Sequence, residues 1–178
     1  KDQRNASVIE PQGELFQDGK PVFKIQGQRS DIQQDGKSIV LKGQITATDL
    51  RDGAVLKGNE IEWRPAEDIL FVRNNFTGAN KQLEVTAKEG RFFTRDRRLE
   101  LNGQIIAKSK SPALQMRSEQ LVWNLKDEKI STNKPVQVDR YLNQQISDRG
   151  NANRADVDLK TKIVTFRDSA KLALQSGL

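Results

Sequence analysis

Hydrophobic and polar residues alternate in short segments that return about every thirty residues. Five apolar segments begin, in chain order, at Ile39, Ile69, Leu99, Ile130 and Ile163. Successive starts are therefore 30, 30, 31 and 33 residues apart. The two clearest segments, residues 39–47 and 99–107, share one pattern over nine positions. Alternation with a period of two is typical of a β-strand with one buried face, so the pattern predicts strands rather than helices.

A second pair of anchors precedes each apolar segment. Small residues stand at Gly27, Gly58, Ala87, Ser118 and Ala152. Five positions beyond each comes a large apolar residue, in order Ile32, Trp63, Phe92, Trp123 and Val157. Turn-forming polar residues follow, as at 65–68 and 95–97. The pattern of each unit therefore predicts a strand, a tight turn and a second strand. We divide the chain into units 22–51, 52–81, 82–111, 112–144 and 145–175.

The repetition predicts an all-β fold in which about five β-hairpins stack along one domain, residues 1–178. A single unit cannot bury its apolar face alone, so neighbouring units must stack. Stacked hairpins give two facing, rolled antiparallel sheets with exposed edge strands at both ends. We expect these edges near Val8 and Ile9 and near Leu172 and Leu174. Ordinary half-buried strands of a β-sandwich would give the same alternation.

Composition excludes several classes of chemistry. The 178 residues contain no Cys and no His, which excludes the usual Ser-His or Cys-His nucleophiles, typical zinc sites and disulfides. We therefore expect no catalytic residues, no metal site and no cofactor. Only 35% of residues are hydrophobic, which favours a shape with more surface than a sphere. The longest unbroken apolar run, residues 69–72, is too short to span a bilayer, and the chain opens on polar residues rather than a signal peptide.

Two phrases carry a resemblance to a known family. Leu41-Lys42-Gly43-Gln44-Ile45 and Leu101-Asn102-Gly103-Gln104-Ile105 resemble the apolar-x-Gly-Asn/Gln-apolar phrase of the lipopolysaccharide-transport proteins LptA, LptC and the amino-terminal domain of LptD. In that group the phrase follows a small-x-x-small-x-aromatic strand, approximated here by Ala87-x-x-Gly90-x-Phe92. The stretch 53–65 looks most like LptC. Residues 73–75 and 134–136 depart from the phrase, which leaves the register of units two and four open.

The resemblance implies an open β-jellyroll with an apolar groove and a role in carrying lipopolysaccharide across the periplasm. It further implies an amino-terminal membrane tether outside this chain and partners at the edge strands. These partners would be LptF and LptG of the inner-membrane ABC transporter and an LptA-like protein; strand pairing could also give a homo-oligomer. Alternating positions offer groove candidates, with the aromatic ones expected on the opposite wall: Ile39, Leu41, Ile45, Ile61, Trp63, Phe92, Leu99, Leu101, Ile105 and Trp123.

Other interpretations remain open at this point. The groove candidates could equally pack as a dry core, giving a ligand-free structural or adhesive repeat protein. The net charge of +6 and the run Arg91, Arg95, Arg97 and Arg98 could attract phosphorylated sugars or form solvated turns. Nucleic-acid binding is disfavoured, because few aromatics remain for stacking on bases. An enzyme is also disfavoured, because Glu60 with Glu62 lacks the geometry of an acid–base pair.

Overall fold

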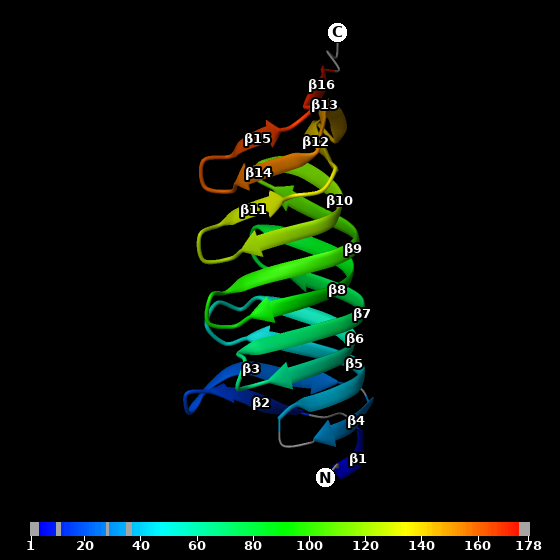
Figure 1. Ribbon diagram of the computed structural model, residues 1–178, viewed down its shortest axis with the longest axis vertical. Coiled ribbons are helices and arrows are strands. Elements are labelled where there is room, and N and C mark those ends of the chain that lie inside the picture. The colour runs from blue at the N-terminus through cyan, green and yellow to red at the C-terminus, as the bar shows by residue number, and fades with distance from the viewer. Residues whose placement is uncertain (1–3, 10–11, 28, 35–36, 175–178) are drawn as a thin grey trace.

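The computed structural model describes the chain except residues 1–3, 10–11, 28, 35–36 and 175–178. All the regular elements of the described residues are β-strands, paired antiparallel throughout and joined into one open sheet. Figure 1 shows the strands stacked along the long axis of an elongated slab, with the two termini at its opposite ends. The expected all-β open jellyroll is confirmed.

Six long strands form the middle of the slab and pair in chain order. They are β5 (Ile39–Asp49), β6 (Val55–Arg64), β7 (Ile69–Ala79), β8 (Leu83–Phe93), β9 (Arg98–Lys110) and β10 (Ala113–Asn124). The register of every neighbouring pair shifts near the middle of the strands. These β-bulges bend the strands, and each strand thereby contributes one half to each of two facing layers.

Layer A contains the halves of β5–β10 that lie around 39–42, 60–64, 69–73, 89–93, 98–102 and 120–124. Layer B contains the other halves, around 45–49, 55–57, 76–79, 83–87, 105–110 and 113–118. Beyond β5, layer A continues into β4 (Arg29–Gln34) and β1 (Arg4–Ile9), and layer B into β3 (Lys20–Gly27) and β2 (Gln12–Gln17).

The layers also separate beyond β10. Layer A continues into β11 (Lys129–Thr132), β14 (Arg154–Asp158) and β15 (Ile163–Arg167), and layer B into β12 (Val136–Leu142), β13 (Gln145–Ala152) and β16 (Lys171–Leu174). We call the line of bulges the spine and the opposite margin, where turns of the two layers face each other, the mouth. In Figure 1 the bends lie on the right and the β8–β9 and β10–β11 turns on the left.

The spine explains the small residues that the sequence repeats. Gly58 is buried at a bulge, where a Cβ atom would lie 2.4 Å from Val72 Cγ1 and 3.1 Å from the carbonyl oxygen of Arg73. Gly43 and Gly103 have φ of 115° and 85°, which a residue with a Cβ adopts only at a cost. The Gly-containing phrase therefore marks the position at which a strand bends.

The structure fixes the register of the two units that lack this phrase. In β7, Asn74 and Asn75 take the place of the Gly phrase with φ of 63° and 62°, a left-handed conformation that Asn tolerates better than most residues. In unit four the strand breaks instead, and residues 133–135 separate β11 in layer A from β12 in layer B. Leu70, Val72 and Phe76 of β7 are buried, as are Ile130, Val136 and Val138 of unit four.

Candidate functional site

The apolar space between the layers is where the structure brings the predicted groove residues together. Nine of the ten are buried, with exposed fractions from 0% for Leu101 to 7% for Leu41, while Ile39 is partly buried against the same cluster. The cluster is continuous from Leu15 of β2 to Val157 of β14 and on to Leu159. One apolar interior therefore runs along most of the slab.

The aromatic groove residues lie in an unexpected wall. The sequence placed Trp63, Phe92 and Trp123 opposite Leu99 and its equivalents, and this was wrong. All lie in layer A, where Phe92 and Trp123 are both cross-strand partners of Leu99, and Trp63 is the partner of Ile39. Because each long strand bends, the two halves of one strand, rather than two successive strands, form opposite walls.

Layer B supplies the facing wall. Among the predicted residues only Ile45 and Ile105 belong to it. Phe23 of β3 meets Phe92 across the interior, edge to face, with ring centroids 5.6 Å apart. Other buried side chains of this wall went unnoticed in the sequence, although they share the same alternation: Ile25, Leu56, Phe76, Leu83, Val85, Leu114 and Met116.

Two polar atoms inside this apolar space have no hydrogen-bond partner within the described part of the chain. They are Ser109 Oγ in layer B and Trp123 Nε1 in layer A, and their residues are 7% and 1% exposed. A buried polar group without a partner is costly. The interior therefore contains unused hydrogen-bonding capacity at two points on opposite walls.

Polar side chains join the two layers across the mouth. At its N-terminal end, Gln17 Nε2 of layer B donates to Asp68 Oδ1 of layer A at 2.8 Å. Arg95 of layer A makes a two-pronged ion pair with Asp18 of layer B, with both N···O distances 2.9 Å, and also contacts Asp68. The hydrogen bonds from Arg95 hold the pKa of the Asp18 carboxyl below its usual value.

The next pair of turns is held by two arginines of opposite layers. Arg51 of layer B donates through Nη1 to the carbonyl oxygen of Thr94 in layer A at 2.6 Å. Its other nitrogens bind the buried carboxylate of Asp49 at 2.9 and 2.7 Å. Beside them, Arg97 of layer A pairs with Asp52 of layer B. Asp49 is 1% exposed, so Arg51 also neutralises a charge at the margin of the interior.

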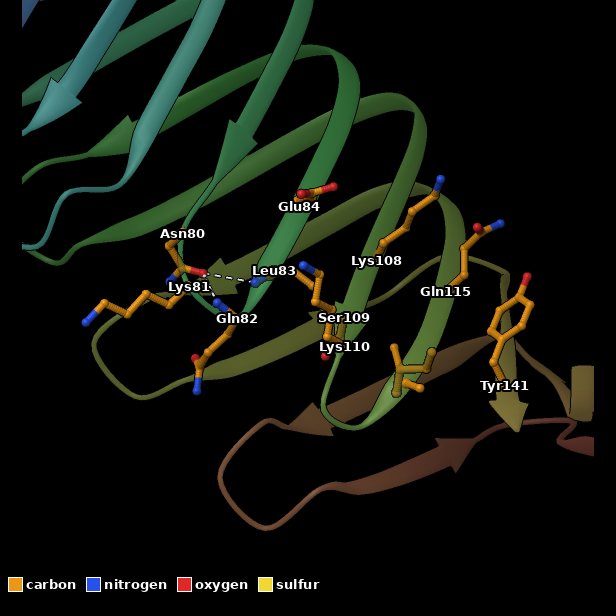
Figure 2. A pocket seen from close by; sticks show the side chains of 12 residues that line it. Asn80, Lys81, Gln82, Leu83, Glu84, Lys108, Ser109, Lys110, Gln115 and Tyr141 are labelled. Atoms are coloured by element: carbon orange, nitrogen blue, oxygen red, sulfur yellow. Dashed lines mark hydrogen bonds between the residues drawn. The ribbon is translucent and has the colours of Figure 1, made fainter. Parts of the chain in front are cut away.

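A fifth contact crosses the mouth where a surface cavity begins. Gln82 of the β7–β8 turn donates through Nε2 to Glu128 Oε1 of the β10–β11 turn at 2.6 Å. The volume of this cavity is about 550 Å³. Figure 2 shows the β7–β8 turn on one side of it and Tyr141 on the other. Asn80 Oδ1 fixes the turn by accepting from the backbone N–H groups of Gln82 and Leu83. Lys81, Lys108 and Lys110 give the cavity a basic rim.

Several charged residues that the sequence offered for anion binding or for acid–base catalysis lie on the outer face of layer A. Arg91 and Arg98 bind Glu100, so with Arg95 and Arg97 at the mouth the whole arginine run is paired with carboxylates. Burial opposes the ionisation of Glu62, but hydrogen bonds from Arg64 and Arg73 outweigh it and lower the pKa of Glu62. Glu60 also pairs with Arg73. The two carboxylates therefore form a structural ion-pair network.

The predicted docking edges lie at the two ends of the slab. Among the strands that the structure describes, β1 pairs only with β4 and β16 only with β13, so both are edge strands. Leu172 and Leu174 are 62% and 70% exposed. Val8 and Ile9 lie in β1, but their side chains fall outside the described part. No group of three or more potential metal-ligating residues occurs in the part that the structure describes, nor any helix long and apolar enough to cross a membrane.

Comparisons with known proteins agree with this architecture. A family model described as lipopolysaccharide-assembly, LptC-related, matches residues 54–173. The chain belongs to this LptC-related family. It is a component of lipopolysaccharide transport, and the resemblance noted in the sequence is confirmed. No curated protein sequence matches the chain.

A solved structure supports the fold of this LptC-related chain. The match is the crystal structure of LptH from Pseudomonas aeruginosa, described as the LptA homologous periplasmic component of the lipopolysaccharide transport device. The TM-score is 0.62 at 9% sequence identity, and the match covers 70% of this chain and 96% of that one. The two proteins therefore share an open jellyroll although few residues are identical.

Proposed function

We propose that the protein binds the acyl chains of lipopolysaccharide between layers A and B. The observation that supports this proposal is the continuous apolar interior of an open, two-layered sheet. Burying an acyl chain is favourable by about 0.8 kcal/mol for each CH₂ group removed from water. An elongated space suits several chains lying side by side.

The unpartnered polar atoms support the same ligand class. Lipopolysaccharide acyl chains are attached through ester and amide groups, whose oxygens accept hydrogen bonds. Trp123 Nε1 can donate to such an oxygen, and Ser109 Oγ can donate or accept. A bound acylated lipid would thus relieve two costs that the interior otherwise carries.

The edge strands suggest how the lipid is passed on. In this proposal the protein works in the periplasm, held to the inner membrane by an amino-terminal helix that precedes this chain. It receives lipopolysaccharide from LptF and LptG of the ABC transporter and passes it to an LptA-like bridge. Pairing with these partners at the edges β1 and β16 would extend the apolar interior from one protein into the next. Pairing of two copies of the chain is the competing use of the same edges.

A second candidate function follows from how closely the interior is packed. Leu70, Leu101 and Met116 are 0% exposed, as expected for a dry core. On this view the protein is a ligand-free scaffold that docks partners through its edge strands. The two functions differ in one respect that can be measured, namely whether lipid reaches the interior.

Photo-cross-linking to lipopolysaccharide tests the proposal. A photoreactive phenylalanine derivative would replace Phe92, which is 1% exposed and faces the interior, in protein folded according to circular dichroism. Its neighbour Phe93 points to the outer face of layer A, where it stacks under Arg98, and serves as the matched control. We expect adducts at Phe92 and none at Phe93.

Further positions extend the test to both walls. Adducts are also expected at Trp63 and Leu101 in layer A and at Ile45 in layer B. The turn residue Lys126 should give none. Equal labelling of Phe92 and Phe93 would indicate non-specific association. Folded variants that give no adduct at any interior position would favour the scaffold function.

A further inference from the structure

We propose that the polar contacts across the mouth form a latch, and that lipid reaches the interior sideways when this latch opens. The proposal rests on the lipid-binding function above and concerns how access to that site is controlled. The latch consists of five contacts between layers: Gln17–Asp68, Asp18–Arg95, Arg51–Thr94, Asp52–Arg97 and Gln82–Glu128.

The latch stands at the long margin where no strand joins the two layers. Along the spine the backbone of six strands passes from one layer to the other, so that margin cannot open without breaking strands. At the mouth the layers end in turns. The contacts that the structure describes between turns of opposite layers are side-chain contacts together with the Arg51 bond to the Thr94 carbonyl oxygen. The mouth is therefore the margin along which the slab can open, with the bulges of the spine as its hinge.

The chemistry of these contacts suits repeated opening. Asp18 and Arg95 have side chains 67% and 54% exposed, so water can replace their partners at little cost. The closed state also leaves Arg97 Nε buried with no acceptor among the described residues, a cost that opening removes. Apolar side chains at the same places would have sealed the mouth more firmly, since they lose favourable burial on opening.

The position of the latch relative to the interior gives it a function beyond stability. Thr94 follows Phe93 at the end of β8 and is itself 0% exposed, two residues from the interior side chain of Phe92. Arg51 binds both the Thr94 carbonyl oxygen and the buried Asp49 carboxylate. Separating the turns thus exposes the part of the interior where Phe23 and Phe92 meet.

Locking the mouth tests the proposal directly. The chain has no Cys, so Asp52→Cys and Arg97→Cys would place the only two thiols on opposite sides of the mouth, to be joined by a short thiol-reactive cross-linker. In this protein, with the photoreactive group at Phe92, we expect lipopolysaccharide adducts to fall about tenfold, equivalent to about 1.4 kcal/mol in the opening equilibrium. If the linker is a cleavable one, cutting it should restore the adducts.

The matched control joins two turns of the same layer. Asp96→Cys and Asp127→Cys lie in the neighbouring β8–β9 and β10–β11 turns of layer A, which are already linked by the Leu125 N–H bond to the Arg97 carbonyl oxygen. This cross-link leaves the mouth able to open and should leave the adducts unchanged. Adducts undiminished in the locked protein would overturn the proposal and indicate that lipid arrives at the ends of the slab.

A measurement without lipid separates the latch from the proposed function. Spin labels at Lys81 and Asp127, in the facing β7–β8 and β10–β11 turns, report the width of the mouth. We expect the distance distribution to broaden towards longer values in Arg51→Gln/Arg97→Gln. The control Arg91→Gln/Arg98→Gln loses the same charge from ion pairs within layer A and should not change it.

The two experiments distinguish a failure of the latch proposal from a failure of the lipid-binding proposal. Broadening by the latch variant without any lipid adduct would sustain the latch and reject the lipid-binding function. An unchanged distance distribution in the latch variant would overturn the latch, whatever the adducts show. Broadening together with loss of adducts only in the locked protein is the result that both proposals require.

Discussion

The two long margins of the slab are closed by different means. At the spine, six strands run from layer A into layer B, and the bend is set by buried glycine and by residues with positive φ such as Asn74 and Gly103. At the mouth, the layers end in separate turns joined by polar side chains, of which Arg51 and Arg95 make the most contacts. One margin is fixed by backbone geometry and the other by exchangeable contacts.

This difference implies that the spine and the mouth affect different properties of the protein. Changes at the spine alter how the strands bend and should act on the stability of the whole fold. Changes at the mouth should act mainly on how often the interior opens, with smaller effects on global stability. Substitutions that separate these two readouts therefore test whether the margins differ in function as they do in structure.

The largest effect is expected at the spine, for Gly58→Val. The new Cβ would lie 2.4 Å from Val72 Cγ1 and 3.1 Å from the Arg73 carbonyl oxygen, where neither neighbour can move freely. Forcing a side chain into a packed interior costs about 3 kcal/mol at the upper end of the usual range. Urea denaturation should show this loss in the free energy of unfolding.

A second glycine provides the control for that substitution. A Cβ at Gly13 of β2 would meet nothing within 4 Å, so Gly13→Ala should leave the unfolding free energy within about 0.5 kcal/mol of the original protein. If Gly58→Val were equally neutral, the spine would be adaptable and its contrast with the mouth would disappear.

An intermediate effect is expected at the mouth, for Arg51→Ala. Among the contacts of the described residues, removing the guanidinium leaves the Asp49 carboxylate, which is 1% exposed, with only the Arg51 backbone N–H bond at 2.9 Å and no opposite charge. Breaking a buried ion pair in this way costs about 3 kcal/mol when both partners are buried. The Arg51 side chain is 30% exposed, and about 2 kcal/mol is therefore expected, measured by urea denaturation.

The double variant Arg51→Ala/Asp49→Asn checks the cause of that loss. Neutralising the buried carboxylate should recover part of the stability, because no unpaired charge then remains. It should not restore the bond to Thr94, so the mouth should still open more often in hydrogen exchange. A double variant no more stable than Arg51→Ala would show that the charge of Asp49 is not the source of the effect.

The sequence predicted the buried positions far better than the contacts across the mouth. Alternation identified the inward positions, because it depends on residues close together in the chain. The phrase around Gly103 was recognised as part of the repeat, but only the structure shows that the strand bends there. The bend at Asn74 and Asn75 was missed, since Asn replaced the expected Gly while also adopting a positive φ. The alternation could not show that the halves of one strand become opposite walls.

Contacts across the mouth join residues that are distant in sequence, which is why no pattern disclosed them. Arg95 meets Asp18 77 positions earlier, and Arg51 meets Thr94 43 positions later. In the sequence, Arg95 belonged to a basic run that suggested a site for anions. Only the packing of layer A against layer B shows that its charge is already neutralised.

The smallest effect concerns pH and the ion pair between Asp18 and Arg95. Hydrogen bonds from Arg95 lower the pKa of Asp18 in the folded protein, so the pair stabilises the fold above the usual aspartate pKa and this contribution is lost as the pH falls through the lowered value. Asp68, which also binds Arg95, stays beside it.

NMR titration of the Asp18 carboxyl should find its pKa below that of an aspartate in an unfolded chain. Asp18→Asn should be slightly less stable than the original protein at neutral pH and equally stable once Asp18 is protonated. A stability difference that persisted in acid would mean that Asp18 acts through packing, and the mouth would then resemble the spine more closely than its charges suggest.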